Sequence, residues 1–299
     1  MGTVASNSGT VGFPPPTTTI GVFDSGFGGL TVLRALIERL PQASFAFLGD
    51  TARLPYGSKS RRTIARYAAQ SAQFLVREQG AEFLVIACNT ASALALDAIQ
   101  DAVPVPVLGV IEPGAAAARA ASHTGEVLVI ATDATVQSHA YAAACRAHGL
   151  RALEKACPLL VPLVEEGWTD HPVTAEVVRI YLDELNAEAA TAGLKPDTLV
   201  LGCTHYPLLR QLIERSVPAG MTVIDSAEAT AEAALRLFSK HDAGCPILSA
   251  PFAERVGDDE APPAEIRCFA TDSVEKFERL GSRFLRRPTG KVELVDLGG

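Results

Sequence analysis

Two cysteines stand at corresponding points of two similar segments of the chain. Cys88 follows the apolar run Phe83–Ala87 and Cys203 follows Leu199–Gly202, and polar residues and a predicted helix come next in both segments. One such cysteine alone is most simply a small buried residue, but recurrence 115 positions apart favours a shared purpose. A helix N-terminus favours the thiolate. A thiolate and a thiol that face one carbon from opposite sides could remove a proton and return another, as in a racemase or epimerase.

Four polar side chains are candidate partners for these thiols: Asp24, Asp50, Glu165 and His205. A protonated His205, two residues beyond Cys203, would favour the thiolate form of that cysteine. Each assignment has an ordinary structural alternative. Asp24 could cap a helix, His205 could be a surface residue at a helix start, and Glu165 could be a solvated helix charge.

The candidate residues follow short apolar runs that alternate with segments of helical periodicity. The predicted strands are Ile20–Phe23, Ser44–Leu48, Phe83–Ala87, Val105–Val110, Val127–Ala131, Leu199–Gly202, Thr222–Ile224 and Ile266–Phe269. The predicted helices are Leu30–Leu40, Arg61–Gln79, Ala91–Ala102, Thr135–His148, Thr174–Ala192, Leu208–Arg215, Ala227–Phe238 and Val274–Leu285. Continuous apolar strands between helices are typical of a parallel sheet covered on both faces, so the predicted fold class is α/β.

The repeated strand–cysteine–helix segment predicts two similar parallel-sheet α/β lobes related by pseudo-symmetry. A looser repeat links Ile20–Ser25 with Val129–Thr132, since both end a strand in small polar residues. Ligands of open α/β sheets bind beyond the carboxyl ends of the strands. We therefore expect the site in the cleft between the lobes, with one cysteine presented by each lobe.

Composition narrows the function further. The 299 residues carry 26 Lys and Arg against 34 Asp and Glu, a formal charge of −8, which argues against nucleic acid or an anionic membrane as partner. No stretch predicts a membrane span or a secretion signal, so a cytoplasmic protein with six free thiols is expected. Residues 1–17 are predicted to be a disordered tail, and 241–264 a loop insertion.

Motifs for cofactors and metals are missing. Thr31 breaks the dinucleotide fingerprint that Gly26–Gly29 begins, no phosphate-binding loop occurs, and no lysine stands at a strand end as an anchor for pyridoxal phosphate. No Cys-x-x-Cys pair supports a zinc site. We therefore expect neither a cofactor nor a metal.

Seven segments carry a resemblance to a known family. They hold both cysteine motifs and the Asp24–Ser25 motif, and agreement extends from about Ile20 to Leu285; the segments are Gly21–Thr31, Leu48–Gly57, Ala87–Ala91, Gly109–Gly114, Cys157–Glu165, Leu201–Leu208 and Thr271–Leu280. In these segments the sequence resembles the glutamate racemases, cofactor-independent enzymes that supply D-glutamate for bacterial peptidoglycan.

The resemblance implies roles for individual residues. Cys88 would deprotonate the D-substrate and Cys203 the L-substrate, Asp24 and His205 would assist the thiols and contact substrate, and Asp50 and Glu165 would support them. Substrate carboxylates and the amino group would be held by a set of small polar residues, Ser25, Tyr56, Gly57, Asn89, Thr90 and Thr204. Thr132 and Thr135 would join the α-carboxylate site.

The resemblance also implies a domain division and leaves alternatives open. The first α/β domain would combine 18–111 with 224–299 and the second would be 112–223. The oligomeric state varies in the family, and a homodimer is one candidate assembly. One alternative is a racemase for another amino acid such as aspartate. A second is a two-lobed amino-acid-binding protein without catalysis, and a third is an interaction role, since some relatives bind DNA gyrase.

Overall fold

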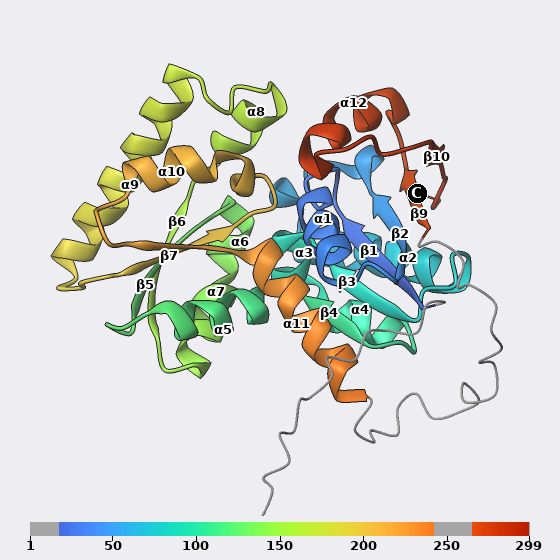
Figure 1. Ribbon diagram of the computed structural model, residues 1–299, viewed down its shortest axis with the longest axis horizontal. Coiled ribbons are helices and arrows are strands. Elements are labelled where there is room, and N and C mark those ends of the chain that lie inside the picture. Colours follow the sequence, from blue (N-terminus) through green and yellow to red (C-terminus); the bar gives the residue numbers. More distant parts are fainter. Residues whose placement is uncertain (1–17, 242–264, 299) are drawn as a thin grey trace, which may run out of the picture.

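The computed structural model describes residues 18–241 and 265–298, whose strands form two parallel sheets (Figure 1). The first sheet holds β1 (Thr19–Asp24), β2 (Ser44–Gly49), β3 (Phe83–Ile86), β4 (Val107–Gly109), β9 (Ile266–Ala270) and β10 (Val292–Leu294). The second holds β5 (Glu126–Ala131), β6 (Arg151–Ala156), β7 (Thr198–Gly202) and β8 (Thr222–Asp225). The predicted α/β class with two parallel-sheet lobes is confirmed. The predicted tail 1–17 and, apart from His241, the predicted loop insertion lie outside the described residues.

Helices surround both sheets. Around the first lie α1 (Leu30–Arg39), α2 (Arg61–Arg77), α3 (Asn89–Leu94), α4 (Leu96–Ala102) and α12 (Val274–Leu285). Around the second lie α5 (Ile111–Ala121), α6 (Asp133–Ser138), α7 (Ala140–Ala147), α8 (Leu160–Glu165), α9 (Pro172–Thr191) and α10 (Arg210–Ser216). Helix α11 (Ser226–His241) lies between the lobes and packs on α1 and α5 (Figure 1). Short 3₁₀ helices are η1 (Thr51–Arg53), η2 (Tyr56–Ser58) and η3 (Tyr206–Leu209).

Burial on both faces explains why the central strands are continuously apolar. In β1, Ile20 and Val22 join the core that also contains Leu33 of α1, whereas Phe23 joins the core on the other face with Leu75 of α2. Side chains along a strand alternate between the faces, so each position of β1 has an apolar neighbour. The packed core on both faces of the sheet therefore holds the carboxyl ends of the strands in place.

The two lobes share one strand order, which is the structural form of the repeat in the sequence. The strands run β10-β9-β2-β1-β3-β4 in the first sheet and β6-β5-β7-β8 in the second. The block β2-β1-β3-β4 therefore corresponds to β6-β5-β7-β8. Cys88 follows β3 and Cys203 follows β7, so the two cysteines occupy equivalent strand ends.

The structure corrects several predicted elements. Strands β6 and β10 and helices α5 and α8 were not predicted: β6 is half-exposed and carries charges, and both helices contain proline. The predicted helix Thr135–His148 is two helices, α6 and α7, because His139 adopts a left-handed conformation with φ of 54°. The predicted helix Ala91–Ala102 is likewise divided into α3 and α4 at Ala95.

The sheet pairing bears on the expected domain limits. The limit between 223 and 224 falls inside β8, which pairs with β7 in the second sheet, and the limit between 111 and 112 falls inside α5. Strands β9 and β10 return to the first sheet, where β9 pairs with β2. The division of the chain into domains at particular residues stays a prediction.

Candidate active site

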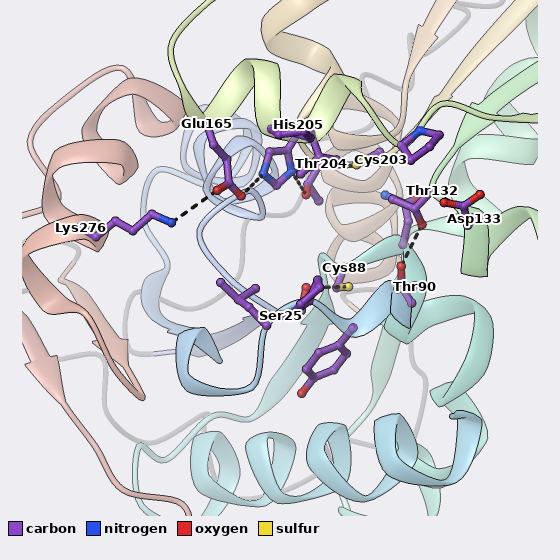
Figure 2. A pocket seen from close by; sticks show the side chains of 18 residues that line it. Ser25, Cys88, Thr90, Thr132, Asp133, Glu165, Cys203, Thr204, His205 and Lys276 are labelled. Atoms are coloured by element: carbon purple, nitrogen blue, oxygen red, sulfur yellow. Dashed lines mark hydrogen bonds and ion pairs between the residues drawn. The ribbon is translucent and has the colours of Figure 1, made fainter. Parts of the chain in front are cut away.

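A cavity of about 560 Å³ lies where the carboxyl ends of the strands of both sheets meet. Its size suits a small ligand. Its wall contains the residues predicted from the sequence at this place, Ser25, Tyr56, Gly57, Cys88, Asn89, Thr90, Thr132, Glu165, Cys203, Thr204 and His205. In Figure 2, Ser25 and Cys88 lie on one side of the cavity, and Cys203, Thr204 and His205 lie on the other. Asp24, Asp50 and Thr135 do not line the cavity but lie behind its wall.

Cys88 is a buried thiol at the start of α3. Its Sγ accepts a hydrogen bond from the backbone N–H of Ala91 at 3.4 Å and donates one to Ser25 Oγ at 3.3 Å. Burial and the nearby carboxylate of Asp24 raise the pKa of Cys88 to about 12. The N–H contact at the helix start lowers the pKa of Cys88, as expected, but desolvation of the charge and Asp24 outweigh this contact. Cys88 carries its proton at neutral pH.

Cys203 belongs to a chain of polar side chains that ends in the other lobe. Nδ1 of His205 lies 4.0 Å from Cys203 Sγ, and Nε2 lies 3.3 Å from Glu165 Oε1. Lys276 of α12 lies 3.5 Å from the other oxygen of Glu165 (Figure 2). Burial disfavours the imidazolium, but the contacts with Cys203 and Glu165 outweigh it and raise the pKa of His205 to about 10. A cation therefore stands beside the Cys203 sulfur at neutral pH.

Glycine at position 28 permits close contact between the lobes at this point. A Cβ atom on Gly28 would lie 2.4 Å from Thr204 Oγ1 and 2.7 Å from His205, closer than real Cβ contacts. Thr31 of the first lobe donates a hydrogen bond to the carbonyl of Thr204 at 3.1 Å. The segment that carries Cys203 and His205 is thus held against the first lobe.

Asp24 lies beneath the cavity wall, where it acts on Cys88 through its charge. Its Oδ2 accepts the backbone N–H of Gly26 at 2.9 Å, and its buried Oδ1 has no hydrogen-bond partner among the described residues. Burial raises the pKa of Asp24, although His205 and three backbone N–H groups act in the opposite direction. A carboxylate in this place opposes loss of the proton from Cys88.

Asp50 does not reach the thiols but holds the loop that presents Tyr56 and Gly57. This fully buried carboxylate accepts hydrogen bonds from Tyr56 Oη at 2.6 Å, Arg53 Nε at 2.9 Å and Thr271 Oγ1 at 2.9 Å. Thr271 follows β9, so Asp50 ties the cavity loop to the C-terminal segment. The hydroxyl of Tyr56 is thereby engaged away from the cavity.

Replacing Asp50 with alanine is expected to lower the free energy of unfolding by about 3 kcal/mol, because the change leaves the buried Tyr56 hydroxyl and Arg53 without their acceptor. Urea unfolding followed by circular dichroism measures this loss. The control is Asp97→Ala, since the carboxylate of Asp97 is 87% exposed and its nearest cation, Arg61, is 3.9 Å away. Equal unfolding midpoints for the two variants would show that the hydrogen bonds of Asp50 do not stabilise the fold.

Small polar groups of both lobes meet on the remaining wall. The hydroxyl groups of Thr90, Thr132 and Thr135 lie 3.0–3.4 Å from one another, with Thr90 from the first lobe and the others from the second. Asn89 is buried, and its Nδ2 has no hydrogen-bond partner among the described residues. Hydroxyl and amide donors of this kind can bind a carboxylate.

Part of the wall was not singled out in the sequence. Leu54, Pro55, Asp133, Pro158, Val161, Pro162 and Lys276 also line the cavity. The segment Cys157–Glu165 was noted for its glutamate, and its prolines and valine supply an apolar side of the cavity. Nothing in the local sequence distinguishes Lys276 from other charges of an amphipathic helix, because its position depends on how α12 packs across the lobes.

The part of the chain that the structure describes gives no sign of a metal centre or a membrane span. Within residues 18–241 and 265–298, no group of three or more His, Cys, Asp or Glu side chains could hold a metal ion. Over the same ranges no helix has both the length and the apolar character needed to cross a bilayer. Five cysteines there are buried and free: Cys88, Cys145, Cys157, Cys203 and Cys268.

Known proteins resemble this chain over nearly its whole length. Residues 20–234 match the family model described as Asp/Glu/Hydantoin racemase. A glutamate racemase from Koribacter versatilis is 53% identical over 288 residues, which cover 94% of this chain and 98% of the relative. The fold is similar to a crystal structure of glutamate racemase from Francisella tularensis in complex with D-glutamate, with a TM-score of 0.80, 33% identity, and coverage of 95% and 99%. A glutamate racemase isoform from Bacillus anthracis gives a TM-score of 0.80 at 37% identity, with coverage of 94% and 98%.

Proposed function

The chain belongs to the Asp/Glu/hydantoin racemase family, and from this premise we propose that it interconverts L- and D-glutamate by proton transfer between Cys88 and Cys203. The observation that carries the proposal is the pair of cysteines, one from each lobe, at equivalent strand ends of one cavity. A binding protein without catalysis has no need for two matched thiols. The substrate assignment is supported by the similarity to glutamate racemases across the chain.

The two cysteines have different charged neighbours. The imidazolium of His205 stabilises negative charge on Cys203, whereas burial and Asp24 keep the proton on Cys88. In the reaction of L-glutamate, Cys203 acts as the thiolate base and removes the α-proton. Cys88 then donates its proton to the opposite face of the α-carbon, which leaves D-glutamate, a protonated Cys203 and a Cys88 thiolate. The D-enantiomer reacts by the same transfers in reverse.

The carbanion between these steps needs preorganised donors. Charge that develops at the α-carbon spreads into the adjacent carboxylate, where neutral donors stabilise it most in a dry site. We assign this task to the hydroxyl groups of Ser25, Thr90, Thr132 and Thr204 and to the amide of Asn89, with Thr135 behind them. The Tyr56 hydroxyl is hydrogen-bonded to Asp50, so we propose that Tyr56 and Gly57 contact the substrate through their backbone atoms. Residues of the chain supply every step, and no cofactor is invoked.

The broader role rests on the family resemblance. We propose that the D-glutamate formed supplies peptidoglycan synthesis, and with it cell shape, in the cytoplasm, and that the chain acts as a homodimer.

Exchange of the α-proton in D₂O tests the proposal. Purified protein with L-glutamate and no added cofactor should remove the α-proton signal from the ¹H NMR spectrum while chiral chromatography detects D-glutamate. Exchange with aspartate but not glutamate would keep the mechanism and change the substrate. If neither amino acid exchanges, while glutamate still protects Cys88 and Cys203 from alkylation, the binding-protein alternative replaces the racemase.

A further inference from the structure

Tyr141 contacts both cysteine-bearing segments. It belongs to α7 in the second lobe, is fully buried, and donates a hydrogen bond from Oη to Asn89 Oδ1 at 2.7 Å. Asn89 begins α3 in the first lobe, directly after Cys88. The two helices belong to different lobes (Figure 1), so this buried hydrogen bond crosses between them.

The hydrogen bond decides which end of the Asn89 amide faces the cavity. The two ends have nearly the same shape, so a side-chain amide turns unless its partners distinguish oxygen from nitrogen. A tyrosine hydroxyl can donate or accept, but the Ser226 hydroxyl donates to Oη of Tyr141, so Oη is left to donate to Oδ1 of Asn89 and this fixes the orientation of the amide. Nδ2 is buried and has no partner among the described residues, although Asn89 lines the cavity. An unpaired buried donor in a cavity wall is suited to a carboxylate oxygen of a ligand.

The tyrosine ring is itself held between two glycines. A Cβ on Gly114 of α5 would lie 3.2 Å from Tyr141 Cε1, and a Cβ on Gly202 of β7 would lie 2.9 Å from Cε2. Gly202 directly precedes Cys203, so the ring packs beside one cysteine segment while its hydroxyl binds the other. Both glycines lie in segments that carried the family resemblance, and a side chain at either position would crowd this ring.

We propose that Tyr141 is a positioning residue that holds the Asn89 amide with its NH₂ group toward a substrate carboxylate. The inference rests on the proposed function and deepens it, because it names what orients one of the donors. Without the hydroxyl the amide can present its oxygen to the carboxylate, and two acceptors repel each other. Tyr141 therefore acts on substrate binding through Asn89 and touches neither substrate nor the moving proton.

The test is Tyr141→Phe, which keeps the ring and removes the hydroxyl. We expect KM for both enantiomers of glutamate, and the calorimetric Kd for D-glutamate, to rise about tenfold, with a much smaller change in kcat. The control is Tyr181→Phe in the same lobe, because the Tyr181 hydroxyl accepts the backbone N–H of Leu159 at 3.4 Å and does not line the cavity. This variant should keep wild-type values.

A second background separates positioning from a general structural effect. In Asn89→Ala protein, Tyr141→Phe should cause no further rise in Kd, since the amide that it orients is gone. A similar tenfold rise in that background, or an unchanged Kd in the single variant, would overturn the proposal. If wild-type protein binds glutamate but does not racemise it, the proposed function fails. The Kd values of the variants still test the role of Tyr141 in that case. If it binds no glutamate, both fall.

Discussion

Replacing Cys88 with serine is expected to lower racemisation of glutamate by about 10³-fold or more in both directions. Each direction needs one thiolate as base and one thiol as acid, so loss of either group stops both. A serine hydroxyl is a far weaker acid than a thiol, and in the buried site beside Asp24 its anion is disfavoured further. Circular dichroism of the reaction mixture measures the loss, and Cys203→Ser should give a loss of similar size.

The two variants should differ in the α-proton exchange that survives. In Cys88→Ser protein the intact Cys203 can still remove a proton from L-glutamate and return a solvent deuteron to the same face. Slow exchange is then confined to the L-enantiomer, and in Cys203→Ser protein to the D-enantiomer. Cys268→Ser is the control, because this buried thiol of β9 does not line the cavity and its loss should spare turnover. Near-normal turnover in folded Cys88→Ser protein would refute the mechanism.

The strands that the sequence indicates most clearly are those buried on both faces, although the partly exposed edge strands β4 and β8 were predicted as well. β1, β3, β5 and β7 are continuous apolar runs because every position meets a helix or another strand, so composition alone indicates them. β6 lies at the edge of its sheet, and its residues Arg151–Ala156 include Glu154 and Lys155, which reach solvent or ion pairs. A half-exposed strand that carries charges has no continuous apolar run, so the sequence did not indicate β6.

Residue types at strand ends predicted much of the site, but not the direction in which each side chain points. Cys88, Cys203 and His205 could be named because parallel strands bring their carboxyl ends to one edge of a sheet. Asp50 could be named for the same reason, yet its partner Thr271 is 221 residues away in the sequence, and their contact turns the carboxylate away from the thiols. The roles of Lys276 and Tyr141 depend equally on contacts between lobes, which local sequence does not record.

Burial explains why the charge state of Cys88 differs from its sequence-based expectation. The helix N-terminus acts on the sulfur through one weak N–H contact, whereas desolvation and Asp24 act on the whole charge. The same comparison at His205 gives the opposite result, since Cys203 and Glu165 supply two contacts that outweigh burial. The balance between desolvation and contacts with charged neighbours, which depends on the folded structure, therefore decides the charge of each group.

Replacing His205 with asparagine is expected to lower kcat/KM for L-glutamate about 10²-fold at neutral pH, because Cys203 loses the cation that stabilises its thiolate. The pKa of His205 is raised to about 10, so the imidazolium is present below that pH and is lost as pH rises through it. Wild-type kcat/KM should therefore fall near pH 10, and this fall should be missing from the His205→Asn profile. Glu165→Gln removes one support of the imidazolium, so the fall should move to lower pH.

Groups other than His205 also titrate in the measured pH range. A control variant at another histidine shows which part of the profile is due to His205. The amino group of glutamate titrates at alkaline pH in every measurement, so only differences between proteins report His205. The control is His148→Asn, because His148 pairs with Glu112 at 2.6 Å in the second lobe and does not line the cavity. Its profile should match wild type. If His205→Asn protein keeps the wild-type fall near pH 10, another group carries that titration and His205 does not stabilise the Cys203 thiolate.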